Sequence, residues 1–123
     1  MIEIRITIDT ALNLLLNRMK IELKFRQNDG TITKGLRLEN LSYKQLFSIV
    51  EASIFDTVMM LPVDLITNET NLCNIITETV KTLARIFHKE EFSLFTNTQT
   101  RKILAPIYAY FDEQLKTKDY EKN

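Results

Sequence analysis

The stretch Ile-Glu-Ile-Arg-Ile-Thr-Ile, at residues 2–8, places isoleucine at every second position with polar side chains between. Side chains alternate between the two faces of a β-strand, so a period of two is typical of a strand with one buried face. The pattern predicts that the chain opens with a half-buried strand. The segment that follows, from Asp9 or Thr10 to Met19, carries apolar residues at helical spacing and predicts a short helix.

The alternation of apolar and polar residues returns at positions 21–25, where Ile21, Leu23 and Phe25 would share one face of an extended chain. The tripeptide at 28–30, Asn-Asp-Gly, tolerates positive φ, and apolar residues resume between 32 and 38. This arrangement predicts a β-hairpin, with Gly35 allowing a bulge in the second arm.

Three longer apolar stripes beyond the hairpin predict helices. Ser42 is a candidate N-cap for the first helix, which Pro62 would end. The second stripe spans residues 72–87, and the third runs from residue 98 or 100 to 115. Pro106 lies in the third stripe, so that helix either bends there or begins just before it.

The order of strands first and helices afterwards favours an α+β domain. In this fold a small antiparallel sheet, made of the N-terminal strand and the β-hairpin, packs against about three α-helices. A chain of 123 residues can bury one core. We expect a single domain over residues 1–117 and a flexible charged tail over residues 118–123.

The composition also narrows the classes of function. No apolar run is long enough to cross a bilayer, and the first residues lack the order of a signal peptide, so we expect a cytoplasmic protein without membrane contact. The one histidine, His88, and the one cysteine, Cys73, both fall in an apolar helical pattern. They supply neither a nucleophile with its base nor three metal ligands. We therefore expect no enzyme activity, no metal and no cofactor.

The helix predicted to begin at Ser42 carries more apolar residues than one core-facing stripe requires. Its surplus side is a candidate surface for a protein partner, or for a second copy of the chain in a homo-oligomer. The candidate partner-binding residues are Phe47, Ile49, Ala52, Phe55, Met59 and Met60.

Nucleic-acid binding is an alternative function. Basic residues would gather on the outward face of the predicted hairpin, and such a face suits an accessory protein that contacts the phosphate backbone. The candidate nucleic-acid contacts are Lys20, Lys24, Arg26 and Arg37. Glu22 and Glu39 dilute this charge, and the net charge of the chain is zero, so nucleic acid is not the partner that we expect first.

A third interpretation rests on the acidic middle of the chain. No Lys or Arg occurs between Lys44 and Lys81. The same stretch contains acidic residues, among them Asp56, Asp64 and Glu69. An acidic surface of this kind would suit an inhibitor or regulator, encoded by a virus or mobile element, that mimics nucleic-acid charge on a host enzyme.

From residue 20 onward, three segments carry a resemblance to a known family. They are Lys-Ile-Glu-Leu-Lys-Phe at 20–25 with its Asn-Asp-Gly turn, Leu-Ala-Arg-Ile-Phe at 83–87 followed by Glu-Phe at 91–92, and Arg-Lys-Ile-Leu-Ala-Pro-Ile at 101–107. Their order resembles that of the tail assembly chaperones of long-tailed bacteriophages. Residues 1–19 have no counterpart in that family, and its usual Asp-Gly segment before the last helix is Thr-Asn-Thr-Gln-Thr here, at 96–100.

The resemblance implies a viral, non-enzymatic chaperone for virion assembly. Such a protein coats the tape-measure protein and helps to recruit tail-tube subunits in the host cytoplasm. It would bind its partners through protein surfaces, in agreement with the surplus apolar side of the helix that begins near Ser42.

Overall fold

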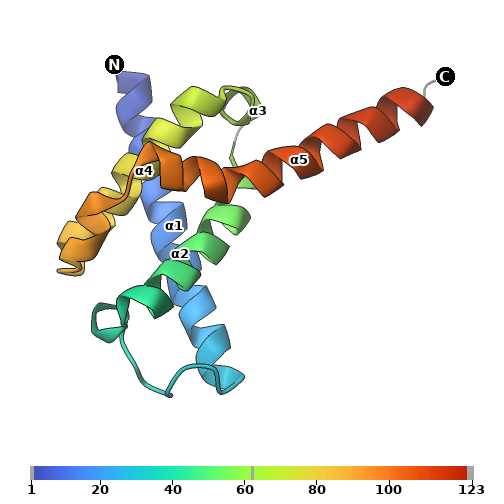
Figure 1. Ribbon diagram of the computed structural model, residues 1–123. Helices are drawn as coiled ribbons and strands as arrows, with labels where there is room; N and C mark the ends of the chain where they lie inside the picture. Colours follow the sequence, from blue (N-terminus) through green and yellow to red (C-terminus); the bar gives the residue numbers. More distant parts are fainter. Residues whose placement is uncertain (1, 62, 122–123) are drawn as a thin grey trace.

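The computed structural model describes the backbone of residues 2–61 and 63–121 and the side chains of residues 8–61 and 64–113. Within these ranges every regular element is a helix, so the predicted α+β fold with a small sheet is wrong and the protein is all-α. The elements, in chain order, are α1 (Ile2–Asn28), η1 (Leu38–Asn40), α2 (Tyr43–Val58), α3 (Val63–Ile66), α4 (Glu69–Ile86), η2 (Glu90–Leu94) and α5 (Asn97–Glu121), as Figure 1 shows.

Helix α1 replaces both the predicted N-terminal strand and the first arm of the predicted hairpin. Its buried side chains recur every four residues, at Ala11, Leu15, Met19 and Leu23. This helical period prevails because residues 2–28 contain neither glycine nor proline and are rich in good helix formers. The alternating residues at 21–25 cannot share one helical face, and Ile21 and Phe25 are 56% and 62% exposed.

The Asn-Asp-Gly segment that suggested a hairpin turn instead ends α1. Gly30 has a φ of 83°, and the Asp29 N–H still donates to the Phe25 carbonyl at 3.0 Å. A glycine with positive φ just beyond a helix is a common stop signal. The predicted second arm is a connection without strands in which Ile32, Leu38 and Leu41 are buried, so it covers one end of the core.

Helix α2 begins where the sequence predicts. The Ser42 side chain accepts a hydrogen bond from the Gln45 N–H, and the Gln45 side chain accepts one from the Ser42 N–H, which is a complete capping box. Helix α4 has an Asn68 N-cap that accepts from the Asn71 N–H. These caps satisfy N–H groups that the first turn of a helix cannot pair internally.

Three of the long helices pack on one another and the fourth lies across them. Helix α1 packs along α2 and α4, and α5 packs against α4 and α2 (Figure 1). Pro106 lies inside α5, which begins at Asn97, so the proline is in the body of the helix and not in its first turn. Beyond its contact with the body, α5 continues outward, and its C-terminal half projects from the molecule (Figure 1).

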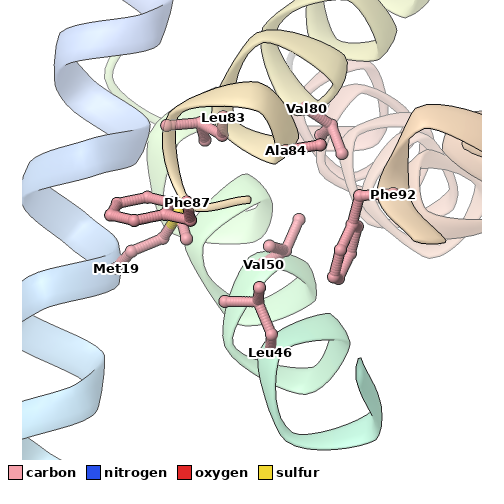
Figure 2. A pocket seen from close by; sticks show the side chains of 8 residues that line it. All are labelled: Met19, Leu46, Val50, Val80, Leu83, Ala84, Phe87 and Phe92. Carbon is pink, nitrogen blue, oxygen red and sulfur yellow. The ribbon is translucent and has the colours of Figure 1, made fainter. Parts of the chain in front are cut away.

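The core fills the space where α1, α2, α4 and η2 meet. Figure 2 shows Leu46 and Val50 of α2 facing side chains of α4, with Met19 of α1 and Phe92 of η2 closing the sides. The void among these apolar groups is about 10 Å³, room for about one water molecule. This part of the core is packed and is no ligand site.

The contact between α4 and α5 is partly polar. The Thr77 and Thr100 hydroxyl oxygens lie 2.7 Å apart, and both side chains are buried. Next to them, the Cys73 thiol donates to the Asn97 carbonyl at 3.4 Å, and the Asn97 amide donates to the Asn74 side chain at 2.8 Å. We call this group the polar seam. Its directional bonds fix how α5 sits on α4.

Candidate protein-binding surface

An open groove of about 380 Å³ crosses the outer face of α2. Most of its lining comes from α2, which we call the floor, and we call the parts that α1 and α5 contribute the walls. Its lining residues are Arg26 from α1, Ser48, Glu51, Ala52 and Phe55 from α2, and Lys102, Ile103 and Pro106 from α5.

Phe55 is the apolar centre of this groove. Its side chain is 48% exposed although it lies on the floor, and Ala52, one turn before it, is too small to cover it. The exposed Pro106 adds apolar surface from the α5 wall, and the buried Ile103 lines the groove beside it. An exposed aromatic ring in a hollow with apolar neighbours is typical of the centre of a protein-protein interface.

The α1 wall is held rigidly by hydrogen bonds. The Arg26 Nε donates to Glu22 Oε1 at 2.9 Å, and one Nη donates to Ser48 Oγ at 2.9 Å. The other Nη donates to the Ser48 carbonyl at 3.3 Å. The Arg26 and Glu22 side chains are only 18% and 23% exposed, so this pair is screened by solvent less than a surface pair is. The wall therefore needs little reordering when a partner binds.

The α5 wall is anchored at Tyr108. Its hydroxyl donates to the Ile66 carbonyl at 2.5 Å. Burial of the ring, followed by the negative charge of Glu69 and the Cys73 thiol, raises the pKa of Tyr108 above its usual value. The raised pKa keeps the hydroxyl protonated, and therefore able to donate, to a higher pH than in an ordinary tyrosine.

The six candidate partner-binding residues do not form one surface. Ala52 and Phe55 lie in the groove. Met59 and Met60, 49% and 52% exposed, follow the end of α2, where Arg18 donates to the Met60 sulfur at 3.5 Å. Ile49 is fully buried in the core.

The remaining candidate, Phe47, belongs to an aromatic cluster and is half-buried. Its ring centroid lies 6.1 Å from that of Tyr43 and 6.2 Å from that of Phe95. Tyr43 in turn stands 4.8 Å from Phe92. Phe47 thus joins α2 to the segment between α4 and α5.

The structure separates the four candidate nucleic-acid contacts. Lys20 and Lys24 are exposed one turn apart on α1, whereas Arg26 turns toward Ser48 of α2. Arg37 lies in the connection after α1, 4.0 Å from Glu39. Without a hairpin these side chains have no common face, and the phosphate-binding interpretation loses its geometric basis.

Sequence analysis missed the walls of the groove. The sequence predicts Arg26 on a basic strand face, and nothing along the chain indicates that Lys102 and Pro106 approach α2. One signal was available, because the two α5 residues are four positions apart on the side of that helix opposite its buried Leu104 and Ile107.

The described side chains contain no group of three or more residues that could hold a metal ion. None of the described helices is both long and apolar enough to cross a membrane. Comparison with protein-family models, curated proteins and solved structures returns no match to this chain.

Proposed function

We propose that this protein is a non-enzymatic protein-binding module that receives an apolar side of a partner in the groove over α2. The observation that supports the proposal is the half-exposed Phe55 ring on the floor of a preorganised hollow. Apolar contact at the centre with charged groups at the rim is the usual anatomy of such an interface. Arg26, Glu51 and Lys102 supply that rim with both signs of charge.

A partner helix would suit the shape of this groove. A helix that lies in a groove inserts a few large apolar side chains along one face. Here the exposed ring of Phe55 and the exposed Pro106 would contact those side chains. The rim charges would then select partners with opposite charges at matching positions.

The test uses a photo-reactive amino acid placed at position 55 of the full chain. The matched control carries it at Leu94, which is 78% exposed on η2 and outside the groove. We expect a discrete cross-linked protein at position 55 and none at position 94, in lysate of the source cells. Equal cross-linking at both positions, or none above background, would reject the groove as a binding site.

The folding of the variants is checked in parallel. Because Phe55 is half exposed, Phe55→Ser should change the melting temperature little while abolishing capture of the cross-linked partner. A variant that melts normally and still captures the partner would contradict the proposal.

Within the class of protein-binding modules, we propose a phage tail assembly chaperone as the specific function. The order of two of the three segments that carry the resemblance supports this proposal, because it is the order that the resemblance implies. The segment 83–87 ends α4, Phe92 lies in the connecting η2, and 101–107 lies in α5. The third segment, 20–25, is helical instead of a hairpin arm, so it gives no support.

The gene neighbourhood and a co-purification test this specific function. A very long tape-measure reading frame close to the gene, and co-purification of its product with the wild-type chain but not with Phe55→Ser, are the expected results. A neighbourhood without tail genes would remove the chaperone assignment and leave the general proposal standing.

A further inference from the structure

One face of α5 is exposed from Arg101 to Glu113, where the description of its side chains ends. The side chains on this face are Arg101, Lys102, Ala105, Pro106, Ala109, Tyr110, Asp112 and Glu113, and we call it the outer α5 face. At about 100° per residue these positions cover one continuous half of the helix. The opposite half carries the buried Ile103, Leu104 and Ile107.

The charges on the outer α5 face are arranged symmetrically about Ile107. Lys102 lies five positions before that residue and Asp112 five positions after it. Ala105 and Ala109 lie two positions before and two after. The outer pair, Arg101 and Glu113, repeats the order of basic residue first and acidic residue last.

We propose that this face binds a second copy of the chain, with the two α5 helices antiparallel about a twofold axis near Ile107. An antiparallel neighbour places Asp112 of one copy beside Lys102 of the other, and the same pair forms twice. A parallel neighbour would instead place Lys102 beside Lys102, which is repulsive. The order of basic and acidic residues along this face therefore favours a second copy of the chain as the partner, with its α5 antiparallel.

The middle of the face allows the helices to approach. Alanines at 105 and 109 would oppose each other across the axis, with the compact ring of Pro106 beside them. Interaxial distances shorten when the side chains at the contact are small. Tyr110, 49% exposed, adds apolar area at either end of this contact.

The projection of α5 makes the face accessible. The C-terminal half of the helix runs out beyond the body (Figure 1), and the exposed residues from Arg101 to Pro106 lie on the side of the helix away from the buried Leu104 and Ile107. An isolated helix shorter than about 15 residues is only marginally stable in water, and the projecting half of the 25-residue α5 is of that length. A neighbouring α5 would therefore stabilise the outer half. The zero net charge of the chain adds no long-range repulsion between copies.

The dimer would carry both grooves on one side. The groove lies on the Ile103 flank of the outer α5 face and shares Lys102 and Pro106 with that face. A twofold axis perpendicular to the helix pair keeps that flank on the same side for both copies. This inference stands apart from the proposed function, because the dimer does not need the groove to be occupied.

The test is a charge exchange at one pair, measured by sedimentation equilibrium of the full chain over a wide concentration range. Wild type should pass from its 14.4 kDa monomer to a species of twice that mass. Lys102→Glu alone and Asp112→Lys alone should each weaken association by about tenfold, because both pairs become repulsive. The double variant, and an equimolar mixture of the two single variants, should restore it.

Matched controls carry the same charge changes elsewhere. Lys24→Glu on α1 and Asp64→Lys on α3 alter exposed residues outside the face and should leave association unchanged. A wild type that stays monomeric at every concentration overturns the proposal. So does self-association that the single variants leave intact or that the double variant fails to restore.

Discussion

At the scale of single residues, the buried hydroxyl of Thr57 differs from its neighbours. The buried side chains of Ser53, Thr77 and Thr79 each donate to the carbonyl four residues before, at 2.7–2.8 Å. Thr57 is 2% exposed, and its Oγ1 has no hydrogen-bond partner among the described residues. Burial of a hydroxyl without a hydrogen-bond partner costs free energy, because the hydroxyl loses its hydrogen bonds to water and gains none in return.

We expect Thr57→Val to raise the free energy of unfolding by about 1 kcal/mol, since valine has nearly the same shape and no hydroxyl to desolvate. Chemical denaturation measures the change. Thr77→Val is the matched control and should lower stability, because it breaks the bond with Thr100. A loss of stability in Thr57→Val would show that its hydroxyl is paired in solution.

Tyr108 gives a residue-scale prediction about pH. Its pKa is raised in the folded protein, so the unfolded chain loses this proton first, near pH 10. The stability linked to Tyr108 is present below that pH and is lost as pH rises through the folded pKa.

We therefore expect the free energy of unfolding to fall above about pH 10, and to fall less steeply in Tyr108→Phe. Denaturation at a series of alkaline pH values compares the two proteins. Equal slopes for wild type and Tyr108→Phe would contradict the prediction.

At the scale of elements, the end of α4 carries a residue in an unfavourable conformation. The Lys89 N–H donates to the Ala84 carbonyl at 2.8 Å and the His88 N–H to the Arg85 carbonyl at 3.4 Å, which is the Schellman arrangement. His88 has the φ of 55° that this arrangement requires. Glycine usually fills that position, because any Cβ is crowded there.

We expect His88→Gly to raise the free energy of unfolding by about 0.5–1 kcal/mol, since relief of the positive φ exceeds the entropy gained by the unfolded chain. Thermal and chemical unfolding both report it. Arg85→Gly, at an ordinary helical position one turn earlier, should lower stability by about 1 kcal/mol. If His88→Gly lowers stability as Arg85→Gly does, the contacts of the His88 side chain stabilise the protein by more than its positive φ destabilises it.

The elements also show where sequence patterns sufficed. Ser42 has no competing interpretation, because a capping residue followed three positions later by Gln45 belongs to a helix start. The alternation in residues 2–8 and 21–25 was ambiguous, because a short stretch of alternating residues can also lie within a helix. The four-residue series of Ala11, Leu15, Met19 and Leu23 joined those stretches into one helix.

At the scale of the whole molecule, the groove could not be predicted. Phe55 and Ala52 were identified on the correct helix, but the walls come from residues about 30 positions before and 50 after them. Which helix lies across which is decided by the packing of complete faces. Because the sequence predicts a hairpin arm where α1 lies, it does not place Arg26 beside α2.

The arrangement of α5 predicts a gradient of local stability across the molecule. Amide hydrogens of α2, with Ile49, Ile54 and Val58 fully buried, should exchange slowest. Those of α5 beyond Tyr108 should exchange fastest among the long helices, because that half projects from the body. Hydrogen exchange resolved by residue at low protein concentration measures this order. Uniform protection along α5 would contradict it.

The polar seam determines how α5 is rotated about its own axis, over the whole length of the helix. Apolar contacts have no preferred direction, whereas the hydroxyl pair of Thr77 and Thr100 bonds in one alignment only. A slip of one residue would turn α5 by about 100° and would carry every side chain of its outer half around with it. Two buried threonines near the start of α5 thus determine the direction in which the outer α5 face points as far along the helix as Asp112.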